Sequence, residues 1–291
     1  MVSRLLTLVG SNGDEIVFGE VGQDFAMGRA ARGFGLAPRT LTELEGAQAG
    51  SVVRYSRTDG RTIHLPIHLF GANRGDVQIK MDRIAAALDW EPGRAQPKLQ
   101  FRLHSGVVFE IGVQYVSGAE TQFDTEASED WATWLLTLRC PDPFWTAIEE
   151  MAFVFRSSGE RRGILPRMVK MMLASSQVLG TQSVSNPGDV PSPIRWIITG
   201  PGDSITATSA DGEEFVLEPA EPLDEGDVRV VDTDTGEVVD GTGEDRYEDL
   251  GTAPKLWELP AGTSVVSVEM INATSDSSVV GLWKPRRRLV H

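Results

Sequence analysis

Alternation of apolar and polar residues with a period of two marks the first half of the chain as mostly β-structure. It is clearest over residues 61–70, RTIHLPIHLF, where the two faces of a strand differ in character. One face would carry Ile63, Leu65, Ile67 and Leu69, and the other His64, Pro66, His68 and Phe70. Two more alternating runs, 99–103 and 107–115, flank the turn His104-Ser-Gly106 and predict a hairpin. Residues 131–140, WATWLLTLRC, predict a strand that is apolar, and therefore covered, on both faces.

One segment departs from this pattern and predicts a helix over about residues 74–90. Its apolar residues recur at helical spacing. They are Val77, Met81, Ile84, Ala85 and Leu88. We expect Asp76 to cap the start of this helix, and Glu91-Pro92-Gly93 to end it.

The second half of the chain predicts short strands that are separated by turns. FVF at 153–155 is one strand, whereas the rest of 151–183 shows no clear period. Six further runs are rich in Val, Ile and Thr: 204–208, 214–218, 227–232, 255–259, 264–270 and 279–283. Strands at this spacing are typical of a sandwich or jelly roll. The acidic stretch Glu218–Asp227, with its two prolines, is expected to be a loop of this domain.

The chain has 291 residues, which is more than a single hydrophobic core usually supports. We therefore expect two domains, residues 1–146 and 147–291. Because no apolar run approaches the roughly 20 residues that span a bilayer, we expect no membrane insertion. The N-terminal apolar run is too short for a signal peptide, which predicts synthesis and folding in a cytoplasm. The single cysteine, Cys140, excludes an internal disulfide and a cysteine-based zinc cage, and we interpret it as a small buried residue.

The charge balance bears on the partners of the protein. The formal net charge is −15, from 42 acidic and 27 basic residues, and acidic side chains are dense between Asp211 and Asp234. Such a surface repels phosphate backbones, so we expect no specific DNA binding. A channel through which DNA passes without binding to the wall is a different kind of contact, and an acidic protein is compatible with it.

Two groups of residues suggest a metal site, and neither fits one. His64 and His68 lie four residues apart on a predicted strand, which separates them by about 13 Å. They therefore cannot both coordinate one ion. Asp232, Asp234 and Asp240 resemble a calcium loop, but the sixth and twelfth positions lack the required glycine and glutamate. A hairpin turn at Asp234-Thr-Gly236 explains this stretch better. We predict no metal and no cofactor.

Candidate catalytic residues are also missing from the pattern. No histidine lies in a recognisable nucleophile motif, and no pair of carboxylates is singled out as an acid and a base. The basic run Arg286–Arg288 is expected to pair with a neighbouring acidic surface, which could belong to another copy of the chain. We therefore predict that the protein is not an enzyme.

Several motifs, each weak by itself, follow one another in an order that points to a known family. A strand with Arg61-Thr-Ile63-His-Leu65-Pro66-Ile67 precedes the helix, and a hairpin leads through His104-Ser-Gly106 to Tyr115 and Gly118. Next comes the corner Cys140, Pro141, Asp142, Pro143, Phe144 and Trp145. Then follow Asn186, Gly188, Asp189, Pro193, Ile194, Gly200 and Pro201, a Leu259–Gly262 turn, and a last aromatic strand with Trp283. In this order the chain resembles the distal tail proteins, or minor tail proteins, of long, non-contractile-tailed bacteriophages (siphophages).

The resemblance implies a mainly β fold. The N-terminal domain would be a tail-tube-like β-barrel or sheet with one helix, and the C-terminal domain a galectin-like β-sandwich. It also implies a homo-hexameric ring at the virion tail tip, which joins the tail tube protein to the baseplate hub and tape measure proteins. Genome DNA would pass through its lumen without specific binding. The ten structural motif residues would be Cys140–Trp145, Asn186, Gly188, Pro193 and Gly200.

The corner at 140–145 is interpreted as a rigid joint between two folded pieces. Its prolines fix φ and remove backbone donors, so the preceding strand must end there. Phe144 and Trp145 can then bury against one or both domains and set their angle. Two alternatives stay open. The second domain could be a carbohydrate-binding module that contacts the host surface, although Trp196, Trp257 and Trp283 fit core positions better. A tail-borne hydrolase ranks third.

Overall fold

The computed structural model describes residues 6–19, 24–45, 49–120, 128–156 and 177–290. The chain forms two compact units. The first comprises Met1–Ile148 together with Arg287–His291, and the second comprises Glu149–Arg286. The chain therefore passes between the units twice, and its last residues return to the first one. The sequence pattern gave no sign of this return.

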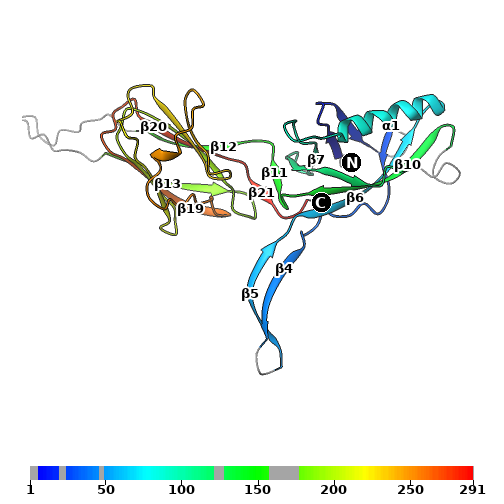
Figure 1. The fold of residues 1–291 in the computed structure, drawn as a ribbon, viewed down its shortest axis with the longest axis horizontal. Coiled ribbons are helices and arrows are strands. Elements are labelled where there is room, and N and C mark those ends of the chain that lie inside the picture. The colour runs from blue at the N-terminus through cyan, green and yellow to red at the C-terminus, as the bar shows by residue number, and fades with distance from the viewer. Residues whose placement is uncertain (1–5, 20–23, 46–48, 121–127, 157–176, 291) are drawn as a thin grey trace, which may run out of the picture. The chain divides into compact units, whose positions relative to one another are not determined.

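Among its described residues, the first unit contains two larger antiparallel sheets, one separate two-stranded sheet and one helix (Figure 1). The larger sheet has the order β2 (Glu15–Phe18), β1 (Leu6–Val9), β7 (Lys98–Arg102), β8 (Val108–Gly112), β11 (Trp145–Ala147) and β21 (Arg286–Arg287). The smaller has the order β3 (Phe25–Met27), β6 (Arg61–Phe70), β10 (Trp131–Cys140) and β9 (Gln114–Ser117). One apolar core takes side chains from both sheets and from α1 (Arg74–Leu88).

The predicted alternation in β6 is confirmed. Its register with β10 sets Ile63 opposite Leu138 and Ile67 opposite Trp134, and these side chains are buried. The prediction that both faces of β10 are covered is wrong. Leu135 lies opposite Pro66 on the outer face and is 53% exposed, because only the inner face meets the core.

The single strand predicted over 107–115 is in fact two strands in different sheets. β8 ends at Gly112 and β9 begins at Gln114, while the buried Val113 between them donates its N–H to the carbonyl of Pro97. The alternation continues across the break because both sheets enclose the same core. It fails at Tyr115, which is 40% exposed.

The predicted helix is present, but its cap differs from the prediction. Asn73 is the N-cap, and its side-chain oxygen accepts from the N–H of Asp76 at 3.1 Å. Asp76 instead accepts hydrogen bonds from the backbone N–H of Ala72 and from Lys80. The helix ends at Leu88, before the Glu-Pro-Gly stop.

The second unit is a β-sandwich. Its five-stranded sheet has the order β12 (Met151–Arg156), β20 (Ser278–Trp283), β14 (Ile194–Thr199), β17 (Val228–Asp232) and β18 (Val238–Asp240). Its four-stranded sheet has the order β13 (Gln177–Asn186), β19 (Gly262–Met270), β15 (Ile205–Thr208) and β16 (Glu214–Leu217), and η1 (Tyr247–Asp249) is a short 3-10 turn. Buried Trp196 lies at the centre of one core, with its ring centroid 5.4 Å from those of Phe153 and Trp257.

One strand predicted in this unit is absent. Residues 255–259 form no strand, and only Leu259 makes an isolated bridge, to Ser192. Trp257 gives the segment its apolar character. Its ring is buried, and its Nε1 donates to the carbonyl of Ala207 at 3.1 Å. The turn predicted at 234–236 is confirmed, since the N–H of Gly236 donates to the carbonyl of Asp232.

Candidate assembly surface

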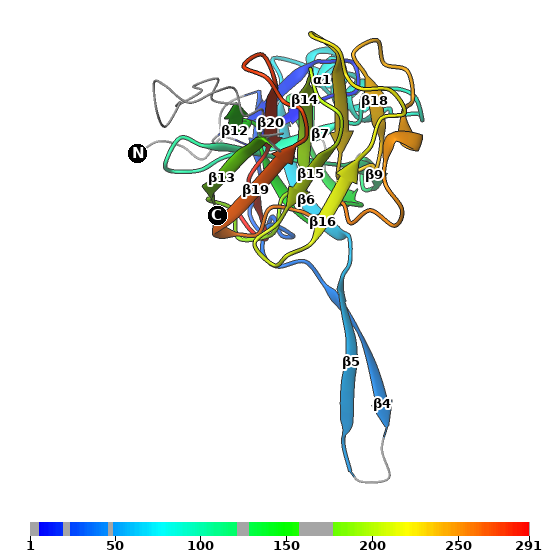
Figure 2. The ribbon, with the colours of Figure 1, turned by 90° about the vertical axis from the view of Figure 1, so that its left-hand side faces the viewer.

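A two-stranded arm is the most exposed feature of the first unit. It consists of β4 (Arg39–Glu45) and β5 (Ser51–Thr58), which pair only with each other among the described strands. Figures 1 and 2 show it projecting away from the sheets of the first unit. Every residue of β4 is exposed, and so is every residue of β5 except the partly buried Thr58. No alternation marks these strands in the sequence, because neither face packs on a core.

The arm carries apolar side chains on both faces. Leu44 pairs with Val52, and Thr42 pairs with Tyr55, so Leu44, Val52 and Tyr55 share one face. The exposed fractions of these three side chains are 45%, 69% and 59%. Leu41 and Val53, each 50% exposed, belong to the other face. An isolated hairpin is marginally stable in water, and clustered exposed apolar residues mark interaction surfaces. The arm therefore has the properties of a segment that packs against another protein.

Arg61, at the start of β6, anchors the base of the arm. Its side chain is buried, and its guanidinium donates to the carbonyls of Gly33 at 3.2 Å, Gly35 at 2.7 Å and Arg288 at 2.5 Å. Burial lowers the pKa of Arg61, although the field of Asp142 opposes this. Arg61 thus connects the segment before the arm to the last residues of the chain.

The C-terminal residues make further contacts inside the first unit. The guanidinium of Arg287 lies over the ring of Phe109, 5.3 Å from its centroid. Val290 is buried in the core, and its N–H donates to the carbonyl of Phe34. Arg286, in the second unit, makes the predicted kind of ion pair, at 3.8 Å from Glu258. This basic run therefore has partners within its own chain.

The corner Cys140–Trp145 leads from β10 in the smaller sheet to β11 in the larger one. Asp142 shapes the turn, because its side chain accepts from the N–H of Phe144 at 3.0 Å. Trp145 is fully buried and stacks on Phe34, with ring centroids 5.9 Å apart. Pro141 is exposed, and Pro143 and Phe144 are partly buried. The corner joins two sheets of the first unit, and the chain leaves that unit only after Ile148.

The thiol of Cys140 is not a candidate nucleophile. The side chain is completely buried, and burial raises the pKa of the thiol to about 12. A nucleophilic cysteine needs the opposite shift, towards a thiolate at neutral pH.

Asn186 organises the other group of motif residues. Its buried amide donates to the carbonyl of Leu259 at 3.1 Å and the hydroxyl of Ser192 at 3.2 Å, and more weakly to the carbonyl of Val190 at 3.4 Å. Its oxygen accepts from the N–H of Gly188 at 3.0 Å. These contacts hold the loop after β13 in place.

The glycines of this group lie where the backbone leaves no room for a side chain. A Cβ at Gly188 would come within 2.5 Å of the carbonyl oxygen of Arg286, and one at Gly200 would collide with the carbonyl oxygen of Asp224. Pro193 is partly buried directly before β14. Asn186 and Gly188 are thus neighbours in space, whereas Gly200 lies at the far end of β14.

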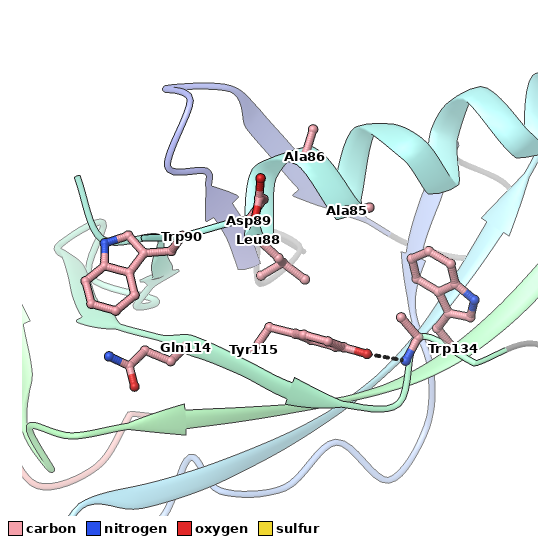
Figure 3. A pocket seen from close by; sticks show the side chains of 9 residues that line it. Ala85, Ala86, Leu88, Asp89, Trp90, Gln114, Tyr115 and Trp134 are labelled. Carbon is pink, nitrogen blue, oxygen red and sulfur yellow. Dashed lines mark hydrogen bonds between the residues drawn. The ribbon is translucent and has the colours of Figure 1, made fainter. Parts of the chain in front are cut away.

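A groove in the first unit was not predicted from the sequence (Figure 3). Its volume is about 690 Å³, and its walls come from the end of α1, from β9 and from β10. Leu88 and Trp90 face Tyr115 across the groove, and the Tyr115 hydroxyl oxygen accepts from the N–H of Ala119 at 3.1 Å. Among the described residues that line it, Asp89 is the one carboxylate.

The residues that the sequence suggested as metal ligands make hydrogen bonds within the protein instead. His64 and His68 make side-chain hydrogen bonds to Thr137 and Thr133 respectively. Asp232 accepts from the N–H of Asp234 within the turn. Across the described ranges of the chain, no group of three His, Cys, Asp or Glu residues could hold a metal ion. Within the same ranges, no helix is long and apolar enough to cross a membrane.

Comparison with known proteins gives a match in structure alone. No protein-family model and no curated protein sequence matches the chain. The fold is similar to that of the SPP1 Dit (gp 19.1) protein, described as a paradigm of the hub adsorption apparatus in phages that infect Gram-positive bacteria. The TM-score is 0.67 at 11% identity, over 97% of this chain and 98% of that one.

This chain has a Dit-like fold. Chains of the phage P2 baseplate in its activated conformation are also similar, in one structure with Ca and in another with Sr. Each has a TM-score of 0.54 and 11% identity, and at least 99% of both chains is covered. The Dit-like fold thus extends over both units, and the resemblance expected from the order of motifs is confirmed at the level of structure.

Proposed function

We propose that the protein is a structural component of the distal end of a siphophage tail. It would form a hexameric ring that joins the tail tube to the baseplate and the host-recognition apparatus. The observation that carries this proposal is the Dit-like fold over 97% of the chain. Its neighbours would be the tail tube protein, the baseplate hub and the tape measure protein, and its place would be the virion, after assembly in the host cytoplasm.

The arm supports the proposal because its exposed apolar side chains could supply a contact between copies. A protruding apolar segment that packs on a different surface of the next copy makes a heterologous interface, and such an interface forms a ring when the rotation between copies closes. Burial of the exposed 69% of Val52 would contribute about 1–2 kcal/mol per contact. The neighbouring Leu44 and Tyr55 on the same face add to this.

The overall charge is consistent with a channel for DNA. With a net charge of −15, the protein offers few sites at which a passing phosphate backbone could bind and release counterions. DNA would therefore pass through the ring without specific binding.

The carbohydrate-binding alternative is weakened by the positions of the tryptophans. Trp196, Trp257 and Trp283 were expected at core positions, and all three are buried, at most 4% exposed. They contact other core rings and present no face to a sugar. The galectin-like character of this sandwich stays part of the proposal.

The arm can be tested with a matched pair of variants. Val52→Asp places a charge on the arm, while Val265→Asp makes the same change at a 49% exposed valine of β19 in the second unit. We expect Val52→Asp to abolish ring formation and Val265→Asp to leave it intact, as measured by light scattering and native mass spectrometry. Equal ring formation by both variants would show that the arm makes no contact between copies.

A further inference from the structure

A small basic pocket lies at the base of the arm. Its volume is about 290 Å³, and its lining comes from several separate parts of the first unit. Arg39 and Thr58 belong to the arm, Phe144 to the corner, and Arg288 to the returning C-terminal segment. Arg61, at the start of β6, and the apolar Leu36 and Ala37, before the arm, also line it. Among the described residues, the lining therefore includes three arginines and no carboxylate.

Arg61 gives this pocket an unusual electrostatic character. The side chain is only 2% exposed, and the three groups that its terminal nitrogens contact are neutral carbonyls. Its Nε has no hydrogen-bond partner among the residues that the structure describes. Burial of a cation is costly unless an opposite charge or a full set of hydrogen bonds compensates it.

The nearby acidic groups make no hydrogen bond to the Arg61 guanidinium, whose partners among the described residues are backbone carbonyls. Asp142 is close enough to influence the Arg61 guanidinium, but it is exposed and its side-chain oxygen accepts from the N–H of Phe144. Asp59 follows Thr58, and its carboxylate bonds to Thr40 and to Arg57 on the arm. Neither residue lines the pocket.

We propose that this pocket binds an oxyanion group, and that in the assembled ring the group is a side-chain carboxylate of a second copy of the chain. Guanidinium groups match carboxylates and phosphates in geometry and bind both through charge-assisted hydrogen bonds. The second copy is favoured by charge complementarity, because the chain has 42 acidic residues against 27 basic ones. The identification of a second copy as the source of the carboxylate rests on the proposed ring, whereas the oxyanion site itself does not.

Binding there would also affect the arm. The pocket contains residues of the arm, of the corner and of the C-terminal segment, so an anion that contacts Arg39 and Arg61 together would tie the arm to the body of the unit. The arm would then be held in one direction at the moment when a neighbouring copy is engaged.

Inorganic phosphate is the probe for the pocket itself. Isothermal titration calorimetry at low ionic strength should show one phosphate bound per wild-type chain. Arg39→Gln removes one lining guanidinium at an exposed position, so the fold should persist, and the affinity should fall by about ten-fold or more. Arg54→Gln, an equivalent change on the arm outside the pocket, should bind as the wild type does. Absence of phosphate binding by the wild type, or equal binding by both variants, would overturn the oxyanion site.

Assembly of the same variants tests the source of the carboxylate. If a second copy supplies it, Arg39→Gln weakens ring formation and Arg54→Gln does not, and added phosphate competes with assembly of the wild type. Rings of Arg39→Gln as stable as those of the wild type would contradict the second copy as the source. Phosphate binding by a chain that forms no rings would refute the proposed function and this source, but leave the oxyanion site standing.

Discussion

Replacement of Asn186 by alanine should destabilise the second unit substantially. The amide makes four hydrogen bonds in a buried position: three donated to the acceptors of Val190, Ser192 and Leu259, and one accepted from Gly188. The carbonyl of Leu259 would keep a bond from the N–H of Ser192, at 2.9 Å. The N–H of Gly188, in contrast, would lose its partner in a place that is only partly open to water.

The size of the effect follows from these bonds. One unsatisfied N–H costs about 1–3 kcal/mol, and loss of the remaining bonds adds about 1 kcal/mol, so the free energy of unfolding should fall by about 2–4 kcal/mol. A unit of this size loses about 2–4 °C of melting temperature per kcal/mol, which predicts a decrease of about 5–15 °C. Differential scanning calorimetry and denaturant titration would measure both quantities.

The control is Asn12→Ala. Asn12 is exposed and accepts one hydrogen bond, from the N–H of Asp14, so its loss should cost about 0.5 kcal/mol or less. If Asn186→Ala were as mild as this control, the buried network would not be what holds the loop after β13, and the structural role given to Asn186 would be wrong.

Three further experiments test other parts of the structure. The thiol of Cys140 should not react with Ellman's reagent at neutral pH until the protein is unfolded, since it is buried and its pKa is raised to about 12; rapid reaction of the folded protein would contradict this. Hydrogen bonds from Arg83 lower the pKa of Asp14, so their stabilisation is complete above the ordinary aspartate pKa of about 3.9 and is lost as the pH falls through the lowered value. The loss of unfolding free energy in Asp14→Asn, measured by denaturant titration, should accordingly be largest near neutral pH and shrink below about pH 4; a loss independent of pH would refute the assignment. Gly281→Ala would press a methyl group into the buried ring of Phe153 and should cost about 1–3 kcal/mol in denaturant titration, with partial rescue by Phe153→Leu; a neutral effect would show that this packing is loose.

The sequence predicts elements whose faces differ sharply in polarity. β6 alternates strictly because one face meets the core and the other does not, and the turn at 234–236 has the glycine that its positive φ of 77° requires. The order of soft motifs led to the Dit-like fold even though only 11% of residues are identical to those of the SPP1 protein.

The pattern of apolar and polar residues misses strands that pack on no core. It also predicts a strand where an apolar side chain is buried from a loop. β4 and β5 were not predicted, because a strand that packs on no core has no reason to alternate. The segment 255–259 has the composition of a strand, but Trp257 buries its ring from a loop. The change of sheet at Val113 leaves no trace in the sequence, because side chains of both sheets enter one core.

The candidate site was predicted only in part. The motif residues Asn186 and Gly188 proved to be neighbours, but the arm, the groove and the basic pocket depend on long-range contacts. Arg61 was noted only as the first residue of an apolar strand. Its bonds to Gly35 and Arg288 join positions far apart in the chain, and no local pattern could have shown them.

The central claim, that the protein forms a ring, can be tested most directly by negative-stain electron microscopy of the purified chain. The wild type should appear, at high protein concentration, as six-fold rings with a central opening, and Val52→Asp as single chains. A wild type that stays monomeric at every concentration, with the same appearance as Val52→Asp, would contradict the claim that the arm assembles this protein into a ring.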